Sequence, residues 1–186
     1  MDHPSIHIET ERLRLRDWSD ADAEPFAAMN ADRCVMAFFP ALLEREQSDK
    51  LMARIRSNMA RDAFGLYAVE ERRTSLFIGF TGLAVATFAA PFTPATEIGW
   101  RLSRQAWGKG YASEAAAAVR DHAFEALGLA ELVSFTSQQN HRSRRVMEKI
   151  GMTCDPADDF IHPGLPSGHE LAPHVLYRIL SGAVSN

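Results

Sequence analysis

The chain has 186 residues, of which 46% are hydrophobic and 24% are charged, and its formal net charge is -4. A chain of this length and composition can bury a sizeable core, so we expect a single domain over residues 1–186. The slight acidic excess argues against a nucleic-acid-binding surface spread over the whole molecule.

Two cysteines, Cys34 and Cys154, lie far apart in the sequence and do not have the spacing of metal ligands. We therefore expect no disulfide framework and no zinc site, and we expect both thiols to be buried. This cysteine usage fits a reducing compartment. The N-terminal residues contain no apolar segment of the kind that a secretory signal requires. Together these features predict a cytoplasmic protein.

Residues 74–96 contain no charged side chain and are numerous enough to span a bilayer on paper. Thr, Gly and Pro recur through this segment, and its β-branched and aromatic residues favour buried strands with a turn. We therefore expect no membrane span.

Hydrophobic periodicity and turn residues predict the secondary structure along the chain. Ser19 and Asp22 have the spacing of a capping box at the start of a helix. Gly128 and Gly151 stand where C-terminal glycine caps are expected. The order of the elements predicts one α/β domain with a mixed sheet. Strands are predicted at 12–16, 66–71, 75–88, 95–103, 131–136 and 174–180, and helices at 23–30, 45–62, 112–127 and 140–150.

Residues 105–115, QAWGKGYASEA, place two glycines around a lysine directly before a helical segment. Unpaired amides and the dipole at a helix N-terminus make such a turn an anion site, and phosphate is the natural ligand. A P-loop would require glycine where Ser103 stands. A dinucleotide-binding fingerprint would require glycine at Ser113 and an acidic residue at the end of a strand, whereas Glu131 opens one.

A third motif fits, because Gln105, Gly108 and Gly110 match the pyrophosphate-binding turn Gln/Arg-x-x-Gly-x-Gly/Ala of the GNAT acetyltransferase family. Residues 140–152, NHRSRRVMEKIGM, resemble the second cofactor segment of that family, in which an asparagine opens a helix that ends in a Lys-x-Gly-Met turn. The chain is therefore identified by resemblance as a member of this family.

Residues 97–102, EIGWRL, and residues 11–18, ERLRLRDW, are similar to the RimJ/RimL-type branch of the family. The resemblance runs from about residue 9 to residue 180. It implies a single mixed, mostly antiparallel, twisted sheet of about seven strands with helices on both faces. The sheet is expected to splay between the fourth and fifth strands.

The resemblance implies acetyl-CoA as a cosubstrate and no metal. Amides from Trp107 to Ala112 would hold the pyrophosphate, and Arg101, Arg104 and Lys109 would add positive charge around it. The backbone edge of residues 98–102 would pair with the pantetheine amides as an added strand does. The cofactor-binding residues that the resemblance implies are Ile98, Gly99, Trp100, Arg101, Leu102, Gln105, Trp107, Gly108, Lys109, Gly110, Tyr111, Ala112, Asn140 and Arg145.

Two of these assignments have a structural alternative. Asn140 either binds the pantetheine arm or only caps the helix that it opens. Arg142, Arg144 and Arg145 either reach the 3'-phosphate or form a solvated face of a short helix.

Acetyl transfer needs a neutral amine, a donor for the oxyanion and a proton for the leaving thiolate. An α-amino group, with a pKa of about 8, is neutral at pH 7 far more often than lysine, with a pKa of about 10.4. Glu97 resembles the acidic residue with which family members take the amine proton, directly or through water; otherwise it is a carboxylate at a strand edge. A backbone amide near Gly99 or Trp100 is expected to meet the oxyanion.

Many family members protonate the thiolate with a tyrosine seven residues after the helix-opening asparagine, but here that residue is Met147. Ser143, one turn earlier on the same helix face, is the candidate acid, as a serine is in the RimJ/RimL-like branch. Its hydroxyl could instead close the capping turn under Asn140, or the thiolate could leave toward solvent without a dedicated acid.

Residues 155–173 are rich in Pro, Gly, His and Asp and predict a long connection near the acceptor entrance. The sequence HELAPH has one residue too many for the zinc motif H-E-x-x-H, and Pro173 would break its helix, so no metal site is expected. His162 and His169 either contact the acceptor or bond nearby carbonyls. The aromatic residues that either shape the acceptor pocket or belong to the core are Trp18, Phe38, Phe39 and Trp100.

The sequence thus predicts an acetyl-CoA-dependent N-acetyltransferase that acts by direct attack in a ternary complex. Its acceptor would be a primary amine, either a protein or peptide N-terminus or a small molecule. A non-catalytic acyl-CoA-binding sensor and a nucleotide- or NAD-binding enzyme are the alternatives. A homodimer is left open.

Overall fold

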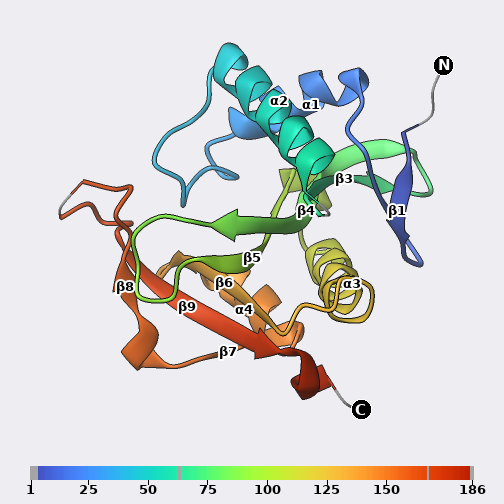
Figure 1. Ribbon diagram of the computed structural model, residues 1–186. Helices are drawn as coiled ribbons and strands as arrows, with labels where there is room; N and C mark the ends of the chain where they lie inside the picture. The colour runs from blue at the N-terminus through green and yellow to red at the C-terminus, as the bar shows by residue number, and fades with distance from the viewer. Residues whose placement is uncertain (1–3, 63, 167, 185–186) are drawn as a thin grey trace.

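The computed structural model describes residues 4–62, 64–166 and 168–184 (Figure 1). Within them, nine strands form one sheet in the order β1-β2-β3-β4-β5-β6-β9-β7, and β8 pairs with β9. The strands are β1 (Ile6–Glu9), β2 (Leu13–Arg16), β3 (Leu66–Glu71), β4 (Leu76–Ala86), β5 (Ala95–Leu102), β6 (Glu131–Ser137), β7 (Thr153–Cys154), β8 (Phe160–Ile161) and β9 (Pro173–Leu180). The helices are α1 (Ala23–Asn30), α2 (Arg45–Arg61), α3 (Tyr111–Glu125) and α4 (His141–Lys149).

The sheet is antiparallel except at the junction of β5 with β6, which run parallel. Only one pair, Glu97 with Val133, is in register across that junction. By contrast, β4 and β5 pair along the whole length of β5, from Ala95 to Leu102. Beyond Glu97 the two strands part, so the splay that we expected between the fourth and fifth predicted strands is confirmed.

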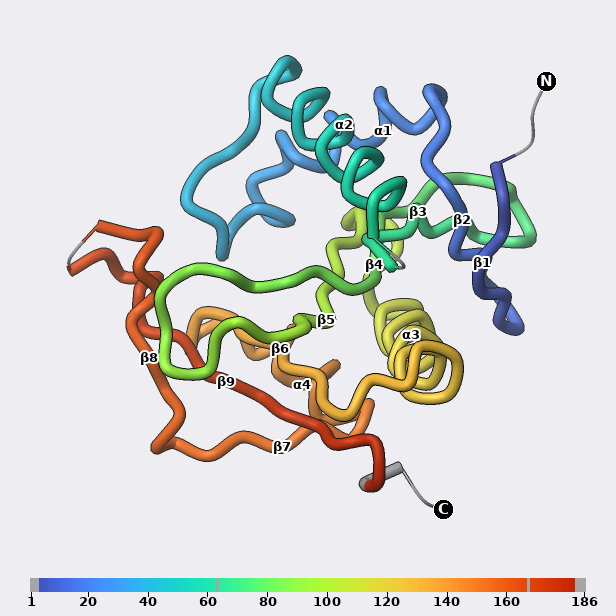
Figure 2. The backbone as a smooth tube through the Cα atoms, viewed as in Figure 1, coloured from blue at the N-terminus to red at the C-terminus, as the bar shows by residue number. Residues whose placement is uncertain are grey.

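Helices cover both faces of the sheet, as Figures 1 and 2 show. Fully buried Ala115 and Val119 of α3 and Met147 of α4 pack on one face with the side chains of β2, β4 and β5. On the other face, Phe26 of α1 and Ile55 of α2 pack with side chains of β3 and β4. The predicted α/β fold with a mixed, mostly antiparallel sheet is therefore confirmed.

The uncharged segment 74–96 forms β4, the loop that follows it and the start of β5. Among the described residues there is no helix with both the length and the apolar composition that a bilayer crossing requires. Three strands, β1, β7 and β8, were not predicted. Two of them contain only two residues each, too few to show a hydrophobic period.

The prediction that both cysteines are buried is wrong, because Cys34 and Cys154 are free and exposed. Cys34 lies in the irregular segment between α1 and α2, and Cys154 lies in β7 at the end of the sheet order. Neither cysteine lies on a face that packs against the core. The residue type alone does not show whether a side chain lies on such a face.

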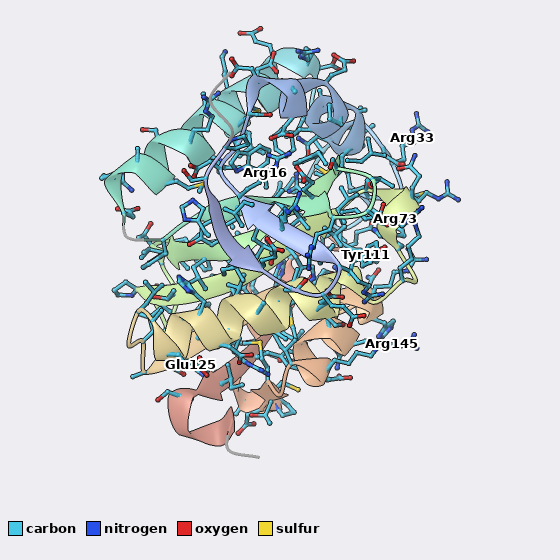
Figure 3. All side chains as sticks on the ribbon, turned by 90° about the vertical axis from the view of Figure 1, so that its right-hand side faces the viewer. Arg16, Arg33, Arg73, Tyr111, Glu125 and Arg145 are labelled. Carbon is cyan, nitrogen blue, oxygen red and sulfur yellow. The ribbon has the colours of Figure 1, made fainter. Side chains whose placement is uncertain are left out.

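A buried ion-pair cluster joins β2, β3 and the start of α1. Arg16 donates two hydrogen bonds to the Asp22 carboxylate, at 2.8 and 2.9 Å, and one to Glu70 at 2.8 Å. The same Asp22 carboxylate accepts a bond from the Ser19 amide at 2.8 Å, which is half of the predicted capping box. The bonds to Asp22 raise the pKa of Arg16. Figure 3 shows Arg16 in the interior below the N-terminal helix.

Replacement of Asp22 by alanine should lower the free energy of unfolding by about 3 to 5 kcal/mol, because it leaves a buried guanidinium without its main partner. Asp20→Ala is the matched control, since Asp20 is 94% exposed and its pair with Arg56 lies at the surface. We expect a loss below about 1 kcal/mol there. Urea denaturation of both variants measures the difference, and equal losses would contradict the assignment.

Candidate active site

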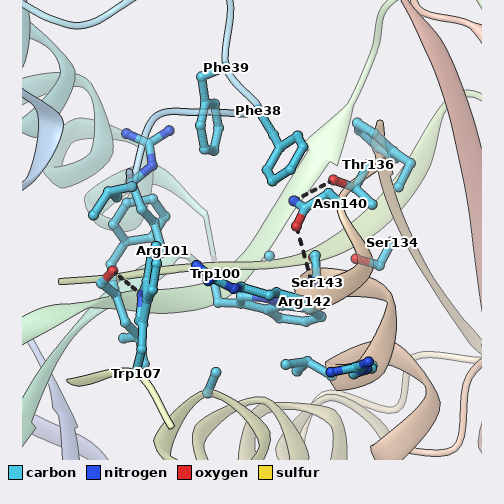
Figure 4. A pocket seen from close by; sticks show the side chains of 18 of the residues that line it. Phe38, Phe39, Trp100, Arg101, Trp107, Ser134, Thr136, Asn140, Arg142 and Ser143 are labelled. Atoms are coloured by element: carbon cyan, nitrogen blue, oxygen red, sulfur yellow. Dashed lines mark hydrogen bonds between the residues drawn. The ribbon is translucent and has the colours of Figure 1, made fainter. Parts of the chain in front are cut away.

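A cavity of about 880 Å³ opens where β5 and β6 part (Figure 4). Its walls come from these two strands, parts of β3, β4 and β9, the turn before α3 and the start of that helix, α4, the connection between α1 and α2, and the connection between β8 and β9. Among the predicted site residues, those that line the cavity are Glu97, Gly99, Trp100, Arg101, Leu102, Trp107, Gly108, Gly110, Tyr111, Ala112, Asn140, Ser143 and Arg145.

Three predicted residues do not line the cavity. The side chain of Ile98 is fully buried in the core on the α3 face. Gln105 and Lys109 are exposed. Of the positive charges expected at the turn, Arg104 is also exposed and does not line the cavity.

The glycine turn presents a row of free amides. Gly108 and Gly110 have φ values of +75° and +81°, a left-handed backbone that glycine adopts without strain. Helix α3 begins directly after them, and no backbone carbonyl of the described residues accepts a bond from the amides of Gly108 to Ser113. Amides of this kind at a helix N-terminus form an anion-binding concavity.

The N-terminal hairpin holds this turn in place, a contact that sequence reasoning missed. Arg12 donates to the Lys109 carbonyl at 2.9 Å and to the Glu114 carboxylate at 2.6 Å. Thr10 also donates to Glu114, at 2.6 Å. About one hundred residues separate the two segments in sequence, so no local pattern indicates their contact.

Positive side chains of α4 line the cavity. Arg142 stacks on the Trp107 ring at 4.5 Å, and Arg145 and Lys149 also line the cavity. Arg145 lies on one side of the molecule in Figure 3, with its side chain directed outward. These cations could neutralise phosphate groups held at the turn.

Arg101 lies on the opposite side of the sheet from α3. It donates to the Asn30 side chain of α1 at 2.6 Å, and its guanidinium stacks on the Phe39 ring at 3.9 Å. Burial lowers the pKa of Arg101 to about 10. Its charge therefore acts beneath the α1–α2 connection and not at the glycine turn.

Asn140 has the role of a helix cap. Its Oδ1 accepts a bond from the Ser143 amide at 3.2 Å, and its Nδ2 donates to Thr136 at 2.9 Å (Figure 4). Ser143 contributes its amide to this cap, and its hydroxyl makes no hydrogen bond with the described residues. Met147, at the position where many family members have tyrosine, is 1% exposed in the core.

The Glu97 carboxyl extends along β5 into the cavity. Its Oε1 lies 3.6 Å from where a Cβ on Gly99 would be, and no cation of the described residues forms an ion pair with it. Burial raises the pKa of Glu97 to about 8. Strand alternation places Glu97, Gly99 and Arg101 on one face, which is the face that α1 and α2 cover.

Some of the aromatic and histidine residues that we expected near the acceptor line the cavity, and others do not. Phe38 and Phe39 project toward the cavity from the α1–α2 connection (Figure 4), whereas Trp18 is a core residue. His162 lines the cavity, but His169 accepts the Leu171 amide at 3.1 Å and does not line it.

Among the cavity residues that were not predicted are three polar ones on β6 and β9, namely Ser134, Thr136 and His174. Polar and apolar residues are mixed in both strands, so strand composition did not single out these three. Within residues 4–62, 64–166 and 168–184, no group of three or more His, Cys, Asp or Glu side chains is arranged to hold a metal ion.

Residues 12–153 match the family model of the acetyltransferase (GNAT) domain. The chain is 31% identical over 176 residues to the uncharacterized N-acetyltransferase YnaD of Bacillus subtilis strain 168, which covers 94% of this chain and 97% of that protein.

Solved structures show the same fold. A GNAT-family acetyltransferase from Bacillus anthracis superposes with a TM-score of 0.78 and 26% identity, covering 94% of this chain and 98% of that one. A spermidine N-acetyltransferase from Vibrio cholerae, in complex with CoA and spermine, gives a TM-score of 0.73 at 18% identity, with coverage of 94% and 98%. The likeness to the latter is one of fold. From the family match and the full-length relative, we conclude that the chain belongs to the GNAT acetyltransferase family and is an N-acetyltransferase.

Proposed function

We propose that this RimJ/RimL-like enzyme transfers the acetyl group of acetyl-CoA to a primary amine by direct attack in a ternary complex. The acceptor is a peptide N-terminus or a small amine. The observation that carries the proposal is the row of free amides at Gly108–Ser113 beside the open edge of β5, with Glu97 at the junction. The protein acts as a single domain in the cytoplasm, where its free, exposed cysteines would stay reduced.

The free amides of the turn match the pyrophosphate of acetyl-CoA. The open edge of β5 matches its pantetheine arm, and the cations of α4 match its phosphate charge. The turn binds the pyrophosphate, and Arg142, Arg145 and Lys149 supply countercharge for the phosphates. Pantetheine amides pair with β5 beyond Glu97, where β6 no longer does. Asn140 keeps one amide hydrogen beyond its two structural bonds, and this hydrogen can reach the same arm.

In the proposed reaction, the amine attacks the thioester carbonyl and its proton passes to Glu97, directly or through water. A carboxyl with a pKa of about 8 is well matched to an α-amino group, whose pKa is also about 8. The tetrahedral oxyanion accepts a hydrogen bond from a backbone amide near Gly99 or Trp100. Its collapse breaks the C–S bond, and the thiolate takes a proton.

Ser143 is the proposed source of that proton. Ser143 lines the cavity, and its hydroxyl forms no hydrogen bond with the described residues, which supports this role over closure of the capping turn. Met147 cannot donate, and its burial in the core supports a second candidate function, a non-catalytic sensor that binds acyl-CoA without turnover.

The enzyme should bind acetyl-CoA and release free thiol only when an amine acceptor is added. Thermal shift with acetyl-CoA, CoA, ATP and NAD, followed by thiol release with peptides, polyamines and aminoglycosides, tests this expectation.

In Gly108→Ala, acetyl-CoA affinity should fall by at least about tenfold, because the added methyl group would stand in the cavity and strain the turn.

Gly128→Ala is the matched control for that variant. Gly128 has a similar φ of +66° and an equally open environment, but it lies beyond the far end of α3. Both variants should lose similar stability, and only Gly108→Ala should lose affinity. Binding without thiol release from any acceptor would favour the sensor, and a shift with ATP or NAD but not with CoA would refute the family's cofactor assignment here.

Replacement of Glu97 by glutamine should lower kcat by about a hundredfold and leave acetyl-CoA affinity unchanged, because glutamine cannot accept the amine proton. Glu46→Gln, on the exposed surface of α2, should match the parent enzyme. Steady-state thiol release across pH 6 to 9 measures the effect. An unchanged kcat throughout that range would remove Glu97 from the reaction.

The raised pKa of Glu97 also makes stability depend on pH. The folded protein keeps the Glu97 proton up to about pH 8, whereas the unfolded chain releases it near pH 4.5, so folding loses stability as pH rises through this window. Relative to Glu97→Gln, the Tm of the parent should fall by at least about 2 °C between about pH 5 and about pH 9. A constant difference between the two proteins would show that the carboxyl has an ordinary pKa.

A further inference from the structure

The half of the cavity beneath the α1–α2 connection has an aromatic wall. Phe38 and Phe39 project into it from that connection (Figure 4). Phe80 lines it from β4, and Phe135 lines it from β6. This half contains the Glu97 carboxyl, so it is where the acceptor amine meets the thioester in the proposed reaction.

Negative charge is scarce in this cavity. Among the described residues that line it, Glu97 is the only acidic one. The same carboxyl is assigned to take the proton of the reacting amine, so it is not available to bind a second ammonium group. A polyamine or an aminoglycoside carries several ammonium groups, each of which needs a carboxylate or water when it is enclosed.

Arg101 adds an uncompensated positive charge to the same half. Its guanidinium lies between the rings of Phe39 at 3.9 Å and Phe80 at 5.4 Å, and it bonds the neutral side chain of Asn30. Its Nε is buried without a partner, and no carboxylate of the described residues pairs with it. A cation in such surroundings repels a second ammonium group more strongly than it would in water.

The two histidines of this half supply no negative charge that would compensate the positive charge of Arg101. The His162 and His174 rings lie 4.9 Å apart at an angle of 42°, and both lie near the Phe135 ring. His162 Nδ1 accepts the Gly164 amide at 3.1 Å, and His174 Nδ1 lies 3.1 Å from the Ala172 carbonyl, an arrangement that suits neutral rings. Burial lowers the pKa of both, so the rings act as further apolar wall.

We propose that the acceptor is a primary amine on an apolar or aromatic body that carries no second cationic group. The inference rests on the proposed function and narrows its substrate class. Aromatic walls contact an apolar body favourably, while the single carboxylate and the unpaired Arg101 disfavour polyamines, aminoglycosides and peptides whose first residue is lysine.

A matched pair of small α-amines isolates the charge. Norleucinamide and lysinamide have the same carbon chain, and lysinamide adds one terminal ammonium group. With saturating acetyl-CoA, kcat/KM from thiol release should be at least tenfold higher for norleucinamide and for phenylalaninamide than for lysinamide or spermidine. A higher value for lysinamide or spermidine would overturn this inference and leave acetyl transfer established. Thiol release from none of the amines, including the peptides of the first panel, would overturn both proposals.

A variant pair tests the aromatic wall. Phe38→Ala should raise the KM for phenylalaninamide by about tenfold, the loss expected when one buried phenyl contact is removed, and should leave acetyl-CoA affinity unchanged. Leu42→Ala is the control, because Leu42 lies in the same connection, is 41% exposed and does not line the cavity. An unchanged KM in Phe38→Ala, or an equal loss of acetyl-CoA affinity, would overturn the assignment of this wall to the acceptor.

Discussion

The parting of β5 from β6 is the constraint on which the rest of the molecule depends. Only Glu97 and Val133 pair across this junction, whereas β4 holds β5 along its whole length. Backbone groups beyond the junction must find water or a ligand, because buried amides and carbonyls without partners are costly. A single gap in one sheet therefore creates the cavity, an open strand edge for an amide-bearing arm, and the position of Glu97 between them.

Charge is unevenly divided along the cavity that this gap opens. Arg142, Arg145 and Lys149 line it from α4, and Arg142 stacks on Trp107 beside the free amides of the turn. The other half contains the carboxyl of Glu97 and the guanidinium of Arg101. Burial raises the pKa of Glu97 and lowers the pKa of Arg101. Low polarity there favours proton transfer between groups of similar pKa and disfavours additional charge.

Hydrogen bonds hold the half of the cavity that contains the glycine turn and the start of α4. The hairpin residues Thr10 and Arg12 fix the start of α3 through Glu114, and Asn140 fixes the start of α4 against β6. Two helix N-termini are thus oriented before any ligand arrives, which reduces the entropy lost on binding. The α1–α2 connection is different, since it is an irregular segment that brings Phe38 and Phe39 over the cavity from outside the sheet.

Elements whose causes are local could be predicted from the sequence. Left-handed turns at Gly108 and Gly110 and the cap at Asn140 depend on neighbouring residues, so their patterns predicted them, and the family motifs built on them led to the fold. The contact of Arg101 with Asn30, 71 positions away, and the exposure of Cys34 and Cys154 depend on the three-dimensional packing of the chain. Such contacts depend on how distant segments pack across a twisted sheet, and the periodicity of one segment carries no information about its partner.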